Sequence, residues 1–154
     1  FAAGEAGGVH AYRFDPKAGT LTALRRTGGV EHPFYLAIAP DRKTLYAIHA
    51  KQFGGKEDEH VAAFKVVGRS GELAFLNRQS ARGTAACYLD ADRTGKSVLV
   101  ANYLSGSVAA LPVRPDGSLG EGGAFVRHAG SSVNPQRQKE PHAHCCAFNA
   151  AGDH

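Results

Sequence analysis

Residues 34–49 read FYLAIAPDRKTLYAIH, and residues 87–102 read CYLDADRTGKSVLVAN. Each segment predicts an apolar strand, a polar turn and a second apolar strand. The two segments share an offset that aligns Leu36 with Leu89 and Lys43 with Lys96. A third copy begins with HCCAFNAAG at residues 144–152. Self-similarity at a fixed period is typical of repeat architectures, so we predict a chain built from copies of one small unit.

A second pattern alternates with the first. Residues 8–14, 60–66 and 107–113 each predict a strand that is followed by a hairpin turn containing Gly and by another strand. Each unit thus holds about four short strands over roughly 50 residues, the size of one β-propeller blade. We predict an all-β fold, a partial β-propeller of about three four-stranded blades, the last incomplete. The repeat units are placed at roughly 8–50, 60–103 and 107–154.

Two questions about this architecture stay open: whether the sheets form a β-sandwich instead, and how so few repeat units could close a ring. A β-sandwich is the first, although a sandwich does not require such regular repetition. The second concerns closure, because about four to eight blades are needed to complete a ring. We therefore expect residues 1–154 to form a single incomplete domain that is a fragment of a longer protein, with self-assembly as the less favoured alternative.

The composition narrows the classes of protein. The 154 residues are 43% hydrophobic and 21% charged, a balance typical of globular domains. We find no run of about 18 apolar residues and no signal peptide, so no membrane partner is predicted. The net charge of +4 comes from scattered Lys and Arg, which favours a small anionic ligand over nucleic acid. We expect a cytoplasmic protein; because the chain does not begin with Met, export stays open, as does the oligomeric state.

The three cysteines do not suggest a disulfide framework. Cys87 stands alone, whereas Cys145 and Cys146 are adjacent, and an odd count suits reduced strand residues in a reducing compartment. The alternative is a metal site, since His142, His144 and Cys146 would share one face of a strand. Zinc ligands usually come from separated segments with paired spacings, so we predict no metal and no other cofactor.

The most polar segment of the chain reads SSVNPQRQ at residues 131–138 and is followed by PHAH at residues 141–144. It brings a cation, several amides and two imidazoles into one short stretch. In the repeat pattern it is the loop that leads into the first strand of a new unit. Such a concentration of polar groups indicates a ligand-binding loop.

The chain resembles the lactonase family of seven-bladed β-propellers over nearly its whole length. The resemblance rests above all on residues 131–138 with 141–144, and is supported by FLNRQS at 75–80, LVANY at 99–103 and RPDGSL at 114–119. It implies a seven-bladed ring, of which this chain would supply slightly under half. It further implies an enzyme that hydrolyses a small anionic sugar lactone, most simply 6-phosphogluconolactone to 6-phosphogluconate in the pentose phosphate pathway, without a cofactor.

Lactone hydrolysis needs a base that activates water, a donor for the developing oxyanion, and groups that hold the substrate. Histidine suits the first role, because imidazole titrates near neutrality. Arginine suits the other two, because its planar fork pairs with oxyanions. We therefore predict His144 or His142 as the general base and Arg137 as the anion and oxyanion binder. The predicted substrate-binding residues are Gln138, Asn134, Asn102 and Tyr103.

Structural roles compete with each of these assignments. Asn134-Pro135 would then only shape a turn, one histidine of the pair would bond to backbone, and Arg137 would bridge two blades. For Asn102 and Tyr103 a structural role is at least as well supported. The remaining histidines are predicted to be turn or surface residues: His10, His32, His49, His60 and His128.

Two other functions stay open. The same family contains cycloisomerases that act on carboxylated muconolactones, and a non-catalytic propeller would bind sugars or a protein through the same pocket. No G-x-S-x-G elbow is present, which argues against a covalent acyl-enzyme. We expect the isolated chain to be inactive, because one side of its channel would be open to water.

Overall fold

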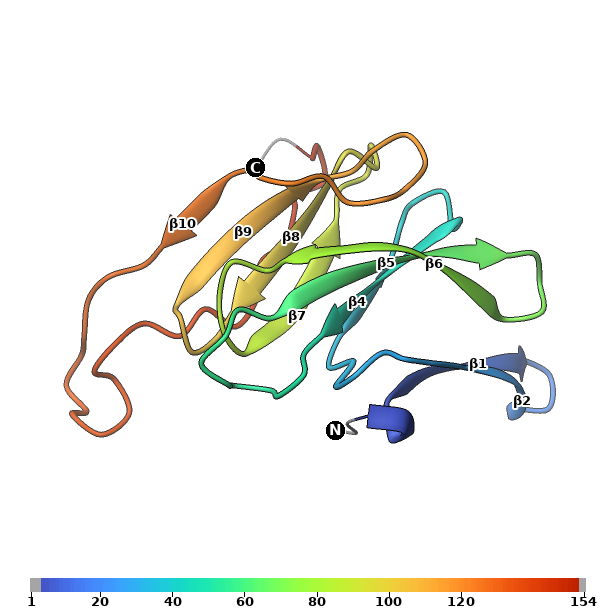
Figure 1. Ribbon diagram of the computed structural model, residues 1–154, viewed down its shortest axis with the longest axis horizontal. Helices are drawn as coiled ribbons and strands as arrows, with labels where there is room; N and C mark the ends of the chain where they lie inside the picture. Colours follow the sequence, from blue (N-terminus) through green and yellow to red (C-terminus); the bar gives the residue numbers. More distant parts are fainter. Residues whose placement is uncertain (1–3, 153–154) are drawn as a thin grey trace.

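The computed structural model describes residues 4–152. Over these residues all regular structure is β-strand apart from η1 (Gly4–Ala6), a single turn of 3-10 helix. The strands form two four-stranded sheets and one two-stranded sheet, which lie side by side in Figure 1. This arrangement confirms the predicted all-β fold and partial propeller.

The two larger sheets have the same topology, and we call them the first and second blades. The first blade contains, in order across the sheet, β3 (Leu36–Ile38), β4 (Thr44–His49), β5 (His60–Val67) and β6 (Glu72–Ser80). The second contains β7 (Ala86–Ala91), β8 (Ser97–Asn102), β9 (Ser107–Pro112) and β10 (Phe125–Arg127). Every pairing is antiparallel between strands that follow one another in the chain. Such four-stranded meanders are typical of propeller blades, and they exclude the β-sandwich that was the alternative fold.

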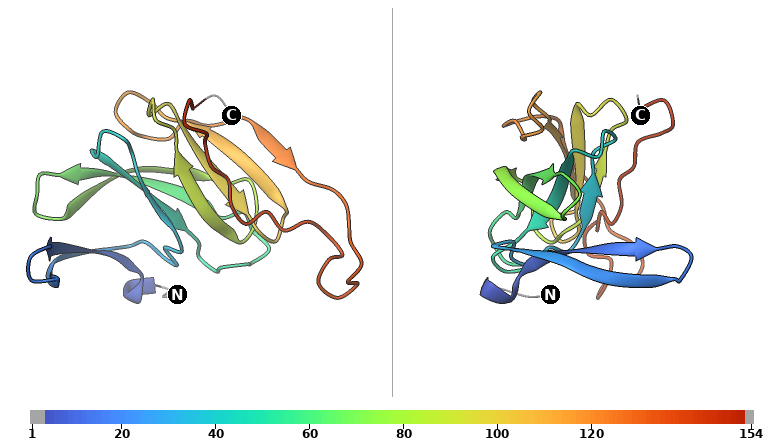
Figure 2. Two further views of the ribbon diagram at one scale, coloured as in Figure 1. Left: turned by 180° about the vertical axis from the view of Figure 1, so that it is seen from behind. Right: turned by 90° about the vertical axis from the view of Figure 1, so that its right-hand side faces the viewer.

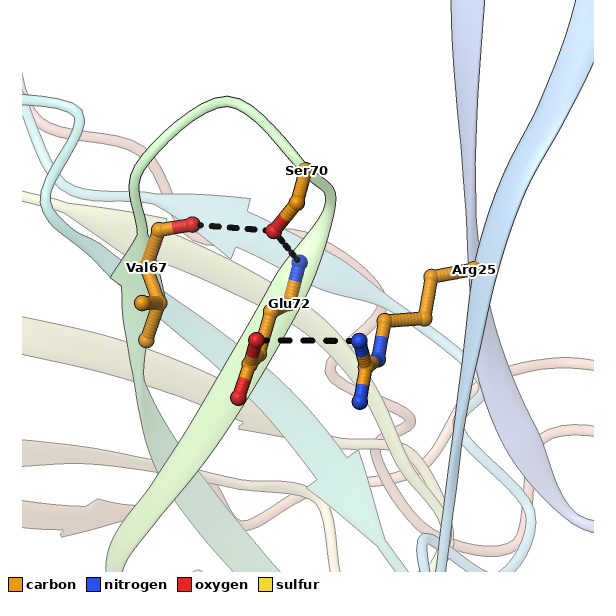
Figure 3. Close-up of polar contacts among 4 residues, drawn as sticks. All are labelled: Arg25, Val67, Ser70 and Glu72. Carbon is orange, nitrogen blue, oxygen red and sulfur yellow. Dashed lines mark hydrogen bonds and ion pairs between the residues drawn. The ribbon is translucent and has the colours of Figure 1, made fainter.

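The two-stranded sheet pairs β1 (Gly8–Asp15) with β2 (Thr20–Gly28) and packs on the first blade. The turn between β5 and β6 reaches the hairpin at Gly71, where a Cβ would lie 2.5 Å from the Cβ of Ala11. Beside it, Arg25 and Glu72 form an ion pair at 3.6 Å (Figure 3). Both side chains are about half exposed, so close packing at Gly71 contributes more to docking than this ion pair does.

The sheets divide the chain differently from the sequence repeat. The blades span residues 36–80 and 86–127, so the predicted units 8–50 and 60–103 each combine strands of two sheets. The structure also corrects the prediction of a strand beginning at residue 144. Residues 128–149 form no strand, because none of the described residues offers this segment a backbone ladder to join.

The core lies between the two blades. Tyr46 and Ile48 of β4 pack against residues of the second blade such as Leu89 and Val100, and all four are almost fully buried. The opposite face of β4 packs through Leu45 against the hairpin side of the molecule. Every residue of β4 is therefore buried, as expected for a strand enclosed on both faces.

The polar loops gather at one end of the blades, which we call the loop end. Antiparallel alternation brings the β4–β5, β6–β7 and β8–β9 connections to this end. The ribbon views show that residues 128–143 lie at the same end of the blades (Figures 1 and 2). Backbone hydrogen bonds join neighbouring loops, from Glu59 N–H to Gly83 O at 2.9 Å and from His128 N–H to Gly106 O at 2.9 Å. The chemistry-bearing residues predicted from the sequence are thus concentrated here.

Candidate functional site

The loop at residues 128–143 is folded by its own polar groups. The Asn134 side-chain oxygen accepts the N–H groups of Gln136 at 3.0 Å and Arg137 at 3.1 Å. The Gln138 side-chain oxygen accepts the N–H of Asn134 at 3.0 Å, and the N–H of Ser132 donates to Gln138 O at 2.9 Å. Asn134 therefore shapes the turn, while the Gln138 amide NH₂ and the Arg137 guanidinium stay exposed to solvent.

The loop is anchored to the second blade at Gly106. This glycine has φ +58°, and a Cβ built on it would lie 2.4 Å from the carbonyl oxygen of Pro141. Only a glycine accepts both this backbone conformation and this approach without displacement. The contact fixes the backbone immediately before His142.

His142 is held by two contacts with Tyr103, which directly follows β8. The imidazole stacks on the phenol ring with centroids 4.4 Å apart and an angle of 11° between the planes. Its Nδ1 lies 3.1 Å from the backbone carbonyl oxygen of Tyr103. A carbonyl can only accept, so Nδ1 carries a proton, and in the neutral form of the ring the lone pair is on Nε2. This tautomer is the one that a general base at Nε2 requires.

His144 lies edge-on to the same tyrosine, with its centroid 5.7 Å from the Tyr103 ring and an interplanar angle of 87°. Its side chain is exposed. The segment that carries the two histidines is not a strand, so strand alternation does not set their directions. They meet instead around the ring of Tyr103, one on its face and the other at right angles to it.

The loop encloses a cavity of about 450 Å³, whose lining includes His142 of the aromatic cluster. Among its lining residues are three predicted site residues, Arg137, Gln138 and His142. The arrangement therefore combines a fixed imidazole, a guanidinium and an amide around one space. His144, Asn134 and Tyr103 are not part of its lining.

Asn102 occupies a different environment. Its side chain is fully buried at 0% exposure, and its amide nitrogen donates to Ala81 O at 2.9 Å and to Ser107 Oγ at 3.1 Å. These contacts tie the end of β8 to the β6–β7 connection. This position favours the structural role that was weighed for Asn102, since solvent does not reach the side chain.

The sequence prediction that His49 is a turn or surface residue is wrong. His49 ends β4 with only 9% exposure, and its Nε2 lies 3.2 Å from an Arg78 guanidinium nitrogen. Burial, followed by the nearby charge of Arg78, lowers the pKa of His49, and the same two causes lower the pKa of His60. The partners of His49 lie 18 and 29 residues away in sequence, so no local pattern indicated the cluster.

Glu59 is a second residue that the sequence reading missed. It is 2% exposed, and its carboxylate accepts the backbone N–H groups of Gly54 at 2.9 Å, Ala85 at 3.1 Å and Ala86 at 2.8 Å. Burial is the largest influence and raises the pKa of this carboxyl, while the three N–H groups oppose the rise. Glu59 thereby joins the β4–β5 loop to the start of β7.

The three cysteines are free thiols. Cys87 lies in β7 as predicted, where its thiol donates to the carbonyl oxygens of Ala143 and His144. Cys145 and Cys146 are not strand residues, contrary to the prediction, because their segment has no ladder partner among residues 4–152. Burial raises the pKa of Cys87, and it raises that of Cys146 to about 12.

The described residues contain neither a metal-binding cluster nor a membrane-spanning helix. None of their His, Cys, Asp and Glu side chains cluster in a group of three or more suited to a metal ion. No helix among these residues has the length and apolar character needed to cross a membrane.

Comparison with protein families gives a match over residues 1–154 to the family described as "Lactonase, 7-bladed beta-propeller". Among curated relatives, a 6-phosphogluconolactonase of Bacillus subtilis is 33% identical over 141 residues, which cover 92% of this chain. A 6-phosphogluconolactonase of Formosa agariphila is 26% identical over 147 residues. The matched regions are 39% and 41% of these relatives, so the chain spans well under half of their length.

Solved structures of related proteins also resemble this chain over most of its length. A protein from Bacteroides fragilis superimposes with a TM-score of 0.83 and 31% identity over 93% of this chain. A periplasmic gluconolactonase of Pseudomonas aeruginosa superimposes with a TM-score of 0.73 and 32% identity over 83% of this chain. The chain matches 38% and 37% of those two structures, respectively.

Proposed function

Because the chain belongs to the lactonase family of seven-bladed β-propellers, we propose that the protein hydrolyses a sugar lactone with residues of the 128–144 loop in its active site. The observation that carries this proposal is the contact between His142 Nδ1 and the Tyr103 carbonyl at 3.1 Å, which leaves Nε2 as the basic nitrogen. Relatives named 6-phosphogluconolactonase support 6-phosphogluconolactone as the substrate and 6-phosphogluconate as the product.

In the proposed reaction His142 acts on water. Its Nε2 removes a proton as the water oxygen attacks the lactone carbonyl, and the imidazolium that forms is stacked on Tyr103. The carbonyl oxygen becomes an oxyanion. When the ring C–O bond breaks, the proton on Nε2 passes to the leaving oxygen, so the product is an open hydroxy acid and the base is regenerated.

Arg137 is proposed to stabilise the oxyanion and to bind the anionic substrate. Its guanidinium is exposed and lines the same cavity as His142, and no protein acceptor pairs with it among residues 4–152. Gln138 is proposed to donate its free amide NH₂ to a sugar hydroxyl. Asn134 acts as a positioning residue, because its side-chain oxygen accepts the backbone N–H of Arg137 and its carbonyl oxygen accepts the backbone N–H of Gln138.

His144 is proposed as a second ligand-facing histidine beside Tyr103. Its exposed ring does not line the cavity, which favours His142 as the base, whereas from the sequence alone His144 had more weight as a ligand-facing residue. The three free thiols suit a reducing compartment, so we retain a cytoplasmic location as part of the proposal.

The test compares His142→Asn and His144→Asn in the full-length protein, with the spontaneous opening of 6-phosphogluconolactone subtracted. Asn at 142 keeps a donor for the Tyr103 carbonyl and removes the base. We expect kcat to fall about 10²–10⁴-fold for His142→Asn, and by about tenfold or less for His144→Asn. Wild-type protein without turnover above the spontaneous rate would favour the binding-module alternative. Unchanged turnover in both variants would exclude this site assignment.

A further inference from the structure

A second polar cleft lies at the loop end, apart from the cavity beside His142. It has a volume of about 920 Å³ and lies between the β4–β5 loop and the strands that the loop connects. Its chemistry-bearing lining includes Glu31, His49, Lys51, Glu59, His60 and Arg78. The lactonase proposal uses none of these side chains.

The protonation of His49 follows from its neighbours. The backbone N–H of Glu31 donates to His49 Nδ1 at 3.3 Å, and an amide nitrogen can only donate. A neutral imidazole carries one proton, which must therefore be on Nε2. Burial and the charge of Arg78 lower the pKa of His49, in agreement with a neutral ring.

This tautomer leaves two donors facing one another. Nε2–H of His49 lies 3.2 Å from Nη1 of Arg78, and a guanidinium has donors but no acceptor. Within residues 4–152 no other partner is found for either nitrogen. A donor on a side chain as buried as His49 costs free energy when it lacks an acceptor, and an acceptor from a ligand would satisfy both groups at once.

The carboxylates that line the cleft do not supply that acceptor, because most are already engaged. Glu59 accepts three backbone N–H groups, Asp58 accepts the Ser80 hydroxyl at 3.1 Å, and Glu31 accepts the N–H of Gly4 at 3.0 Å. Lys51 and Lys56 also line the cleft, and neither has an acceptor in the described part of the chain. Glu57 is the fourth carboxylate of the lining, and the donors without an acceptor within residues 4–152 are Nε2–H of His49, the Arg78 guanidinium and the two lysines.

We propose that this cleft binds an oxyanion, a phosphate or carboxylate group, between Nε2–H of His49 and the guanidinium of Arg78. His60 stands directly opposite His49 in the β4–β5 register and lines the same cleft, so it can donate a third hydrogen bond. Charge-assisted bonds from a planar guanidinium are the usual means of holding such groups. The inference is independent of the reaction at His142.

Inorganic phosphate is the first probe, and NMR of the histidine side chains in the full-length protein is the readout. The free protein should show His49 as the Nε2–H tautomer, and phosphate should shift its signals in a saturable way. Arg78→Gln should weaken phosphate binding at least about tenfold, because a charged hydrogen bond is lost. Arg78→Lys should bind with intermediate affinity, and Arg25→Gln, which removes an arginine outside the cleft, should bind like wild type.

Acetate and glucose 6-phosphate identify the source of the oxyanion. If glucose 6-phosphate binds more tightly than inorganic phosphate and its binding depends on Arg78, the cleft is assigned to a phosphorylated metabolite. If the two bind with equal affinity, it is assigned to the free ion. Arg78-dependent binding of acetate alone would assign it to a carboxylate. Absence of any His49 response to all three probes in wild type, which needs no variant to fold, would overturn the proposal. Binding that is equal in wild type and Arg78→Gln would overturn it as well.

Discussion

The imidazole of His142 lies flat against the phenol of Tyr103 and also bonds to the backbone carbonyl of that same residue. One residue of the second blade thus fixes both the plane and the tautomer of the proposed base. The two contacts are separable by mutation, because a side-chain change at Tyr103 removes the stacking and leaves the carbonyl in place.

Tyr103→Phe should therefore keep kcat/KM within about twofold, since the stacked ring is retained. Tyr103→Ala should lower it by up to about tenfold, because aromatic pairs contribute about 0.5–1.5 kcal/mol beyond their buried area. Steady-state hydrolysis of 6-phosphogluconolactone by the full-length protein is the measurement. An equal loss in Tyr103→Phe and Tyr103→Ala would show that the hydroxyl, which both variants lack, matters rather than the stack.

Arg137 offers a second test, because the loop uses its backbone and leaves its guanidinium unpaired within the described residues. Arg137→Gln should lower kcat/KM about 10²–10³-fold if the guanidinium stabilises the oxyanion, and Arg137→Lys should recover part of this loss. Arg93→Gln is the matched control, because Arg93 is an equally exposed arginine in the β7–β8 turn, at the opposite end of the blade. Equal activity of the Arg137 and Arg93 variants would remove Arg137 from the mechanism.

The sequence predicted the hairpins of the blades well because their pairing is local. Residues 34–49 and 60–76 each contain both strands of a hairpin with its turn, so alternation and turn residues sufficed. The segment at residues 144–149 shows the same apolar pattern but forms no strand, since a strand also requires a hydrogen-bonded neighbour. His49 was misread for a related reason, as its burial depends on Glu31 and Arg78, which only the folded chain brings near.

Gly106→Ala tests the anchor of the loop. The substitution would place a Cβ against the carbonyl of Pro141 and would also strain a backbone at φ +58°. Gly95→Ala is the matched control, because Gly95 has φ +70° but nothing within 4 Å of its virtual Cβ. Both variants should lose about 1–2 kcal/mol of unfolding free energy from backbone strain.

Only Gly106→Ala should also lower kcat, because only that change displaces the backbone that leads into His142. Urea unfolding and steady-state kinetics on the same preparations separate the two effects. Equal catalytic loss in both variants would mean that stability alone, rather than the position of the loop, limits activity.

Glu59 makes the stability of the loop end dependent on pH. Burial raises the pKa of this carboxyl above that of an unfolded chain, even though Gly54, Ala85 and Ala86 donate N–H groups to it. The folded state therefore retains the proton to a higher pH. The stabilisation is complete below the ordinary glutamate pKa of about 4.3 and is lost as the pH rises through the raised value.

A glutamine side chain is neutral at every pH, so the Glu59→Gln variant lacks this pH dependence of stability. The unfolding free energy of wild type minus that of Glu59→Gln should therefore decrease as the pH is raised from about 4 to about 8, with about 1.4 kcal/mol for each unit of pKa shift. Urea unfolding over this range measures the difference. Glu72→Gln, at a half-exposed carboxylate, should show little of the effect. Parallel curves for wild type and Glu59→Gln would mean that the Glu59 carboxyl titrates alike in the folded and unfolded states.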